Sequence, residues 1–268
     1  MRTALNGEFL EHTVFGQLTE YAEFYRSLSD STMLWISQGT NSVINIDTYV
    51  FSSMQGTLES IHDVLFKGRI NDSYALLRKY YDATIINLYS NLYLSDNFSI
   101  DNFIVEKINN WIKGNETIPS FGKMSEYIIK SPKVSEITHL IYKNGAFKGS
   151  SFEDLRQRCN DHTHYLYYHN LLSNDNEVYL KNRLSTLDSF SKDLKDILVL
   201  HLSYLFYQND HYMMSSDYVD SLDCGLTPEK DSQYWVAPFI QDIFDKIIKA
   251  NRPDIAETIK GKTSMKIE

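Results

Sequence analysis

Residues 72–92 read DSYALLRKYYDATIINLYSNL, and this stretch decides the fold class. Its large apolar side chains recur in steps of three and four residues: Leu77, Tyr81, Ile85, Leu88 and Leu92. That spacing places them on one side of an α-helix, which turns once about every 3.6 residues. Asn71 or Asp72 can accept the first free amide protons and so act as the N-cap. The stretch therefore predicts a long amphipathic helix.

The same period continues on both sides of this stretch. A longer helix is expected from about Glu177 to Tyr207, and another begins at Pro238, which suits a first helical turn, and ends before Pro253. Further segments show the helical period less fully: Ser42–Phe66, Asp101–Lys113, Lys123–Ile129 and Val134–Tyr142. A short strand within Asn41–Val50 stays open as an alternative, because β-branched residues alternate there.

Few residues of the chain favour tight turns or linkers. It has 11 Gly and 5 Pro, with no internal repeat and no low-complexity segment. The pattern predicts an all-α fold, a helical bundle in which residues 1–268 form a single domain. Residues 1–40 are a candidate N-terminal extension. Residues 260–268 carry no periodic pattern and are expected to fray.

Composition and charge limit the function classes. The longest apolar run, Ile197–Tyr207, is broken by His201 and Ser203 and is too short to cross a bilayer. Cys159 and Cys224 stand far apart with no CxxC pattern, as in proteins of a reducing compartment. The chain is therefore expected to be cytoplasmic, with no membrane partner. The formal net charge of -9 does not favour general DNA binding, but it leaves room for a local basic pocket that acts on RNA.

Residues 151–170, SFEDLRQRCNDHTHYLYYHN, form the stretch whose side chains suggest chemistry. Ser151 followed by Asp154 resembles a capping box, so the segment from Leu155 onward is expected to be helical. Polar and ionisable side chains then crowd together: Arg156, Arg158, Asn160, Asp161, His162, His164 and His169.

Arg158 and His164 supply what metal-free cleavage of RNA requires. Their positions on a helix differ by about 120°, and the long Arg side chain can still reach the cleft that the imidazole faces. A neutral His can take the proton of a ribose 2′-OH, and an Arg can hold the phosphate with its planar set of donors as charge builds up. Asn160 can orient the phosphate or the imidazole by hydrogen bonds.

The segment Arg158–His164 resembles the R-x(4–6)-H motif of the HEPN superfamily, compact helical bundles that include many RNases of toxin–antitoxin and antiviral systems. Stretches within residues 68–80 and 215–238 also resemble uncharacterised bacterial proteins that carry such a motif. The resemblance implies a HEPN-like core with additional flanking helices. It assigns the catalytic pair to Arg158 and His164, with Asn160 beside them.

The register of the motif has an alternative. Arg156 and His162 have the same spacing as Arg158 and His164, so Arg156, His162 and Asp161 are candidate supporting residues. Cys159 takes the position at which the family's polar residue usually stands.

The resemblance also implies partners. An RNA substrate, a homodimer in which two motifs face each other, and an inhibitory or sensor protein are expected. No cofactor is expected. A metal is not expected either, because His162, His164 and His169 with Asp161 would be poorly placed as ligands on a helix.

Two functions remain open from the sequence. The first is a metal-independent endoribonuclease, acting as a toxin or antiphage effector. The second is a catalytically inactive helical module that binds a protein or a nucleotide, in which Arg158 forms a structural ion pair with an acid such as Asp161. An RNase requires Arg158 and His164 in one exposed, electropositive groove. The placement of these two residues therefore distinguishes the two functions.

Overall fold

Long helices make up most of the chain in the structure, a computed structural model that describes residues 5–35, 45–148, 152–176, 182–226 and 234–268. The longest are α2 (Thr13–Thr32), α3 (Ile46–Phe66), α4 (Ile70–Asn97) and α10 (Arg183–Gln208). The expected all-α helical bundle is therefore confirmed. Within the described ranges, none of the helices is long and apolar enough to cross a membrane.

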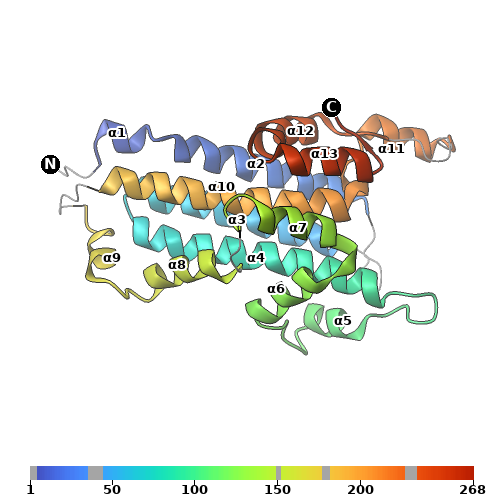
Figure 1. Cartoon of the computed structure of the whole chain (residues 1–268), viewed down its shortest axis with the longest axis horizontal. Helices are drawn as coiled ribbons and strands as arrows, with labels where there is room; N and C mark the ends of the chain where they lie inside the picture. Colours follow the sequence, from blue (N-terminus) through green and yellow to red (C-terminus); the bar gives the residue numbers. More distant parts are fainter. Residues whose placement is uncertain (1–4, 36–44, 149–151, 177–181, 227–233) are drawn as a thin grey trace.

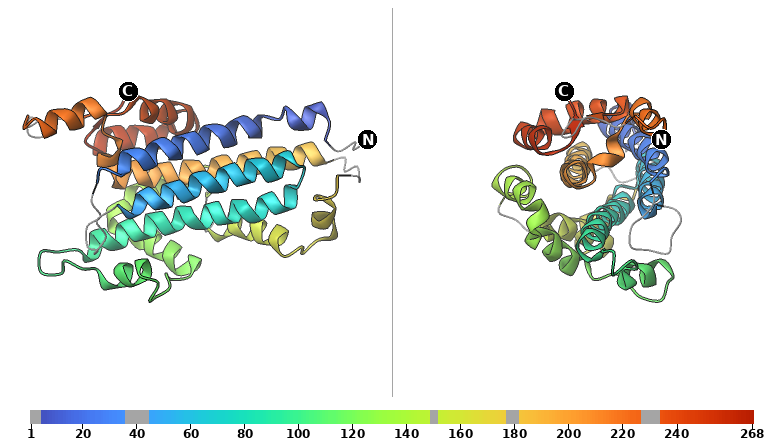
Figure 2. Two further views of the ribbon diagram at one scale, coloured as in Figure 1. Left: turned by 180° about the vertical axis from the view of Figure 1, so that it is seen from behind. Right: turned by 90° about the vertical axis from the view of Figure 1, so that its right-hand side faces the viewer.

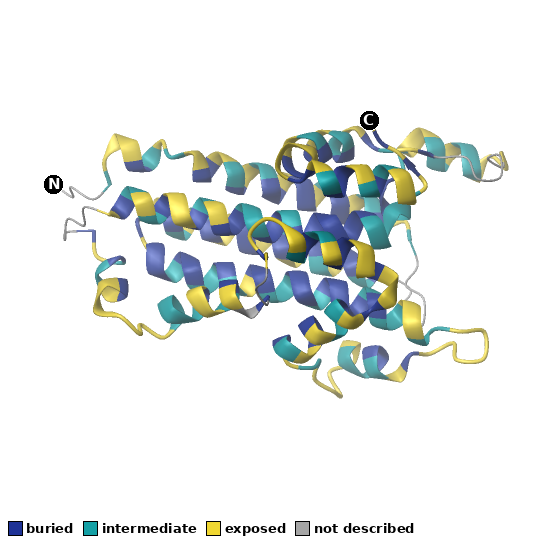
Figure 3. Ribbon diagram, viewed as in Figure 1, coloured by how far each residue is buried: buried dark blue, intermediate teal, exposed yellow. Residues whose placement is uncertain are grey.

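These long helices enclose one hydrophobic core. α2 packs against α3, α3 against α4, α4 against α10, and α10 back against α2, which closes a ring (Figures 1 and 2). The apolar side chains predicted for the central helix all lie inside it: Leu77, Tyr81, Ile85, Leu88 and Leu92 are buried. Buried residues follow the inner sides of the long helices in Figure 3.

Shorter elements cover the ring. α6 (Phe121–Lys130) and α8 (Glu153–Thr163) pack on α4, and α7 (Ser135–Lys143) packs on α10. The other short helices and 3-10 turns are α1 (Gly7–Leu10), α5 (Glu106–Ile112), Pro132–Val134, α9 (Tyr168–Leu172), Asp210–Met213 and α11 (Ser216–Asp223). α9 lies at one end of the bundle and the loop between α4 and α5 at the other (Figures 1 and 2).

The C-terminal part begins as the sequence predicts. α12 (Pro238–Ile243) has Pro238 in its first turn, and it continues as the π-helical segment Phe244–Lys249. Pro253 does more than end this helix, because it also stands in the first turn of α13 (Pro253–Lys262). α13 and the π-helical segment pack against each other and against α10.

Three sequence predictions concern residues that lie partly outside the described ranges. These are the start of the helix expected from Glu177, Ser151 of the capping box, and residues 41–44 of the alternative strand. The helices that follow these positions begin at Arg183, Glu153 and Ile46.

The interpretation of residues 1–40 as an N-terminal extension is wrong for the described part. α2 forms one side of the ring, and its inward side chains are fully buried: Val14, Leu18, Tyr25 and Leu28. These residues do stand at helical spacing, but polar and charged residues between them make the stripe less obvious than that of α4.

The expectation that residues 260–268 fray is also wrong. α13 extends to Lys262, and Met265–Lys266 form strand β2, which pairs in parallel with β1 (Tyr234–Trp235). Met265 is fully buried and Ile267 is 7% exposed. A two-residue strand is too short to show a period, so sequence pattern could not reveal it.

A chain of buried hydrogen bonds crosses the core. The hydroxyl of Tyr80 lies 3.0 Å from that of Tyr25, and the Tyr25 hydroxyl lies 2.6 Å from Nδ1 of His201. Nε2 of His201 lies 2.9 Å from Oδ1 of Asn87, whose amide nitrogen donates to Asp47 at 2.7 Å. Asn87 Oδ1 can only accept, so His201 carries its proton on Nε2 and accepts from Tyr25. Burial lowers the pKa of His201 to about 3, which keeps it neutral.

The buried hydrogen-bond chain ends at the carboxylate of Asp47, which is 4% exposed. Tyr212 donates its hydroxyl proton to Asp47 at 2.8 Å, and Asn91 donates to it at 3.1 Å. Burial raises the pKa of Asp47 to about 6, and these hydrogen bonds only partly oppose the rise. The core therefore holds a carboxylate whose ionisation is unfavourable.

Candidate functional site

A pocket of about 480 Å³ lies where α8, α9 and the turn between them approach α4 and α10. Its wall includes Arg158, Asp161 and His162 of α8, so part of the predicted motif does line one pocket. It also includes side chains that the motif did not predict: Tyr74, Tyr167, His169, Asn170, Lys192 and Asp193. We call this space the α8 pocket.

The end of α8 determines which residues reach the pocket. After the C-cap His164, Tyr165 takes a left-handed conformation with φ 49°. The amide of Tyr165 donates to His162 O, and that of Leu166 donates to Asp161 O. These two bonds are those of a Schellman motif, which reverses the chain at a helix end. Asn170 then donates its side-chain amide to Asp161 O at 2.8 Å, which fixes the returning segment against α8.

Arg158 lies at the pocket with its guanidinium bound to Asp193. Nη2 of Arg158 donates to Oδ1 of Asp193 at 2.8 Å, and Nε donates to Oδ2 at 3.4 Å. The Arg158 side chain is 51% exposed and that of Asp193 only 7%. The ion pair uses one edge of the guanidinium, and Nη1 has no hydrogen-bond partner among the described residues.

His162 is held in one orientation by two neighbours. Asn71 donates its side-chain amide to the main-chain oxygen of His162 at 3.0 Å, so Oδ1 of Asn71 faces Nδ1 of His162, also at 3.0 Å. Because Oδ1 can only accept, Nδ1 carries the proton and Nε2 keeps its lone pair. The ring of Tyr74 stacks on the imidazole, with 3.9 Å between centroids.

The environment of His162 keeps it neutral. Burial, with a smaller contribution from nearby His169, lowers the pKa of His162 to about 4. Near neutral pH the imidazole is therefore uncharged, and Nε2 can accept a proton. The negative charge of a bound phosphate would raise this pKa and so make the imidazole a stronger base.

His164, Arg156 and Asn160 lie apart from the α8 pocket. His164 is exposed at the end of α8 and is not part of the pocket wall. Arg156 donates from Nε to Oδ1 of Asp82 at 2.7 Å, and its guanidinium lies over the ring of Phe121. Oδ1 of Asn160 is buried with no hydrogen-bond partner among the described residues. The pocket therefore brings Arg158 together with His162, four residues on, and not with His164.

The remaining predicted residue, Asp161, does line the pocket. Its carboxylate accepts from Gln157 at 2.9 Å, and Arg158 pairs with Asp193 instead of with Asp161. Lys192 adds a second cation to the wall, and its Nζ lies 3.0 Å from Asp196. Both cations of the pocket are therefore partly neutralised by carboxylates.

Some of the residues that sequence reasoning missed had a visible signal. Asp193 stands three residues after Phe190, whose side chain belongs to the apolar stripe of α10, and an acid at that spacing indicates a buried ion pair. Asn71 or Asp72 was expected to cap the central helix. The helix begins at Ile70 instead, and Asn71 binds His162. Tyr74 and Lys192 had no distinguishing signal.

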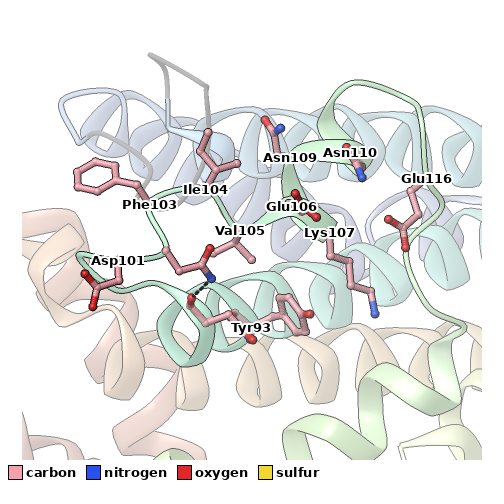
Figure 4. A pocket seen from close by; sticks show the side chains of 12 residues that line it. Tyr93, Asp101, Phe103, Ile104, Val105, Glu106, Lys107, Asn109, Asn110 and Glu116 are labelled. Carbon is pink, nitrogen blue, oxygen red and sulfur yellow. Dashed lines mark hydrogen bonds between the residues drawn. The ribbon is translucent and has the colours of Figure 1, made fainter.

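A second pocket, of about 890 Å³, lies beside the loop between α4 and α5. Asp101, Glu106, Lys107 and Glu116 are among its lining side chains (Figure 4). Nζ of Lys107 lies over the ring of Tyr93, 5.2 Å from its centroid. None of the predicted site residues belongs to this pocket.

In the described ranges, no group of three or more His, Cys, Asp or Glu side chains is placed to hold a metal ion. Comparison of the chain with protein-family models, with curated proteins and with solved structures finds no match.

Proposed function

We propose that this chain is a HEPN-like, metal-independent endoribonuclease, acting in the cytoplasm as a toxin or antiphage effector. The observation that supports it best is that Arg158 and His162, from successive turns of α8, line one pocket. An Arg beside a neutral imidazole with a free lone pair is the pair of groups that cleavage at a ribose 2′-OH requires. The role that the motif gives to His164 passes to His162 in this proposal.

The proposed reaction is an internal transfer at phosphorus. Nε2 of His162 takes the proton of the ribose 2′-OH, and the 2′ oxygen bonds to the adjacent phosphorus. The bond from phosphorus to the 5′ oxygen of the next nucleotide breaks, and that oxygen takes up a proton. His169, the second imidazole of the pocket wall, is the candidate donor. Nη1 of Arg158, which is free of the Asp193 ion pair, stabilises the charge on the phosphate. The products end in a 2′,3′-cyclic phosphate and a 5′-OH.

The exposed segment beside the pocket supports the expected homodimer. Its large apolar side chains reach solvent: Tyr165, Leu166, Tyr167, Tyr168 and Leu171 are each at least 44% exposed. Apolar side chains grouped in this way favour a protein contact. A dimer formed through this segment would place two α8 pockets close together, and an inhibitory or sensor protein could bind the same surface.

The Arg158–Asp193 ion pair favours a second function, a catalytically inactive helical module that binds a protein or a nucleotide. A carboxylate 2.8 Å from the guanidinium offsets its attraction for phosphate. Lys192 is paired too, so the pocket is not strongly electropositive. In this alternative, Arg158 and His162 contribute only to the stability of the protein and to the shape of the pocket that holds the ligand.

Incubation of the purified protein with total RNA in EDTA tests the proposal. We expect cuts whose 5′ fragments carry a 2′,3′-cyclic phosphate, and light scattering should report a dimer. His162→Ala should lower the cleavage rate by about 100-fold or more. His164→Ala, the same substitution two positions further along the chain, is the matched control. Intact RNA with the wild type, or full cleavage by His162→Ala, would contradict it. Loss of cleavage in His164→Ala alone would instead return the base to the residue that the motif predicts.

A further inference from the structure

An apolar pocket of about 440 Å³ opens on the outer side of the bundle, between α3, α4 and α5. Tyr49 and Val50 line it from α3, Ala83 and Ile86 from α4, and Trp111 from α5. α3 and α4 pack directly against each other along the bundle. The pocket shares no residue with the α8 pocket.

The wall of this pocket has an unusual composition for an acidic chain. Charged residues make up 23% of the sequence, yet none of the described residues that line the pocket is charged. Small side chains, Ser53 and Ala83, leave the space open. Tyr49 and Ile112 remain 59% and 42% exposed at its rim. Exposed apolar surface of this kind is unfavourable in water unless something covers it.

We propose that this pocket binds a neutral, largely apolar small molecule. Its volume falls in the range of small-molecule sites, which are mostly lined by aliphatic and aromatic side chains. The absence of a charged lining residue disfavours an ionic ligand, because no opposite charge among the described residues of the wall would compensate its lost hydration. The hydroxyls of Ser53 and Tyr49 can each hydrogen-bond one polar group of the ligand.

The enclosure by a third helix favours a small molecule over a protein partner. Two helices alone would leave an open groove of the kind that an amphipathic helix fills. Here Trp111 and Ile112 of α5 add a third side, so three helices bound the space instead of two. An apolar space of this size can hold one or two fused rings.

Two dyes with the same ring system test the proposal. N-phenyl-1-naphthylamine is neutral, and 8-anilinonaphthalene-1-sulfonate adds one negative charge; both fluoresce more strongly in apolar surroundings. We expect saturable binding of the neutral dye, with the sulfonate at least about tenfold weaker. Ser53→Leu, which fills the pocket, should weaken binding of the neutral dye at least about tenfold as well. Ser60→Leu is the matched control, because it makes the same change seven residues further along α3, outside the pocket.

Energy transfer locates the bound dye. Trp111 should transfer excitation to it, and Trp111→Phe should lose this transfer while it keeps the aromatic wall and the affinity. Circular dichroism confirms that each variant is folded. No saturable binding, or equal binding by Ser53→Leu and the wild type, overturns the proposal. A wild-type dimer that becomes monomeric in Ser53→Leu overturns it too, because a second copy would then be the occupant.

Discussion

The imidazole of His162 lies flat on the ring of Tyr74, with the two planes 8° apart. Stacking fixes the tilt of the imidazole, and the hydrogen bond from Nδ1 to Asn71 fixes its rotation within that plane. A general base works only when its lone pair is aimed at the proton that it takes. Tyr74 and Asn71, both from the first turns of α4, therefore position His162, and the bundle itself orients the candidate base.

Replacement of the two histidines should have unequal effects on cleavage. His162→Ala removes the proposed base and should lower the cleavage rate by about 100-fold or more. His164→Ala changes an exposed side chain outside the pocket and should lower it less than about threefold. Single-turnover rates on one labelled RNA measure both. Equal losses in the two variants would argue against the geometry proposed for the site.

Asn71→Asp should change the protonation of His162. A carboxylate beside Nδ1 favours the charged imidazole, so the pKa of His162 should rise from about 4 toward neutral pH. Because the pKa is lowered in the folded protein, His162 costs stability as the pH falls from about 6.5 through 4. Asn71→Asp should reduce that loss. An NMR titration of the His162 ring protons in the wild type and in the variant measures the pKa. A pKa that stays near 4 would show that Asn71 does not control it.

The Arg158–Asp193 pair should be coupled in stability. Arg158→Gln leaves a carboxylate that is 7% exposed without its cation, and should lower the free energy of unfolding by about 1–3 kcal/mol. The neutral pair Arg158→Gln with Asp193→Asn should recover most of this loss. Urea unfolding of the four proteins in the cycle measures the coupling energy. A coupling energy of zero would show that the ion pair does not contribute to stability.

Asp47→Asn should stabilise the protein in a pH-dependent way. The pKa of Asp47 is raised from 3.8 to about 6, so its contribution to stability is present below pH 4 and is lost as the pH rises through 6. Asparagine stays neutral at every pH and can donate to Tyr212. The variant should therefore exceed the wild type by about 1–3 kcal/mol at pH 7.5, with a small difference at pH 4. Urea unfolding at both pH values gives the difference in stability between the variant and the wild type. His201 has the opposite pH dependence, because its pKa is lowered, but it is present in both proteins and its effect cancels in this difference. A wild type that is the more stable at pH 7.5 contradicts the prediction.

Tyr165→Gly should relieve backbone strain. A non-glycine residue in the left-handed region costs about 1 kcal/mol, and Tyr165 is 44% exposed, so its ring contributes little packing. The melting temperature should rise, or stay level if the greater chain entropy of glycine offsets the gain. Tyr168→Gly, which alters the exposed residue at the start of α9, is the control and should lower it. A large fall for Tyr165→Gly would mean that the ring makes a contact worth more than the strain.

Local periodicity was enough to predict the fold class. The stripe of α4 and that of α10 stand at helical spacing over many turns, and burial followed them. α2 was not recognised because Glu20, Glu23 and Arg26 lie between its apolar residues. β2 was missed because its burial depends on pairing with Tyr234, thirty-one residues earlier in the chain.

The site was only partly predictable, for a geometric reason. Counting residues along an ideal helix gives the direction of each side chain only while the helix lasts. α8 ends at Thr163, so the angle between Arg158 and His164 could not be read from helical spacing. The partners of the site lie far away in the sequence: Asn71 binds His162, and Asp193 binds Arg158. No local pattern reports contacts of that kind.

The buried hydrogen-bond chain has a consequence for how this sequence can change over generations. Tyr25, Asp47, Asn87 and His201 come one each from α2, α3, α4 and α10. Each member fixes whether its neighbour must donate or accept, so a replacement that is harmful alone can become neutral once its neighbour has also changed. Descendants of this sequence should therefore keep all four residues or exchange them in linked pairs, and covariation at these positions would record the order of those steps.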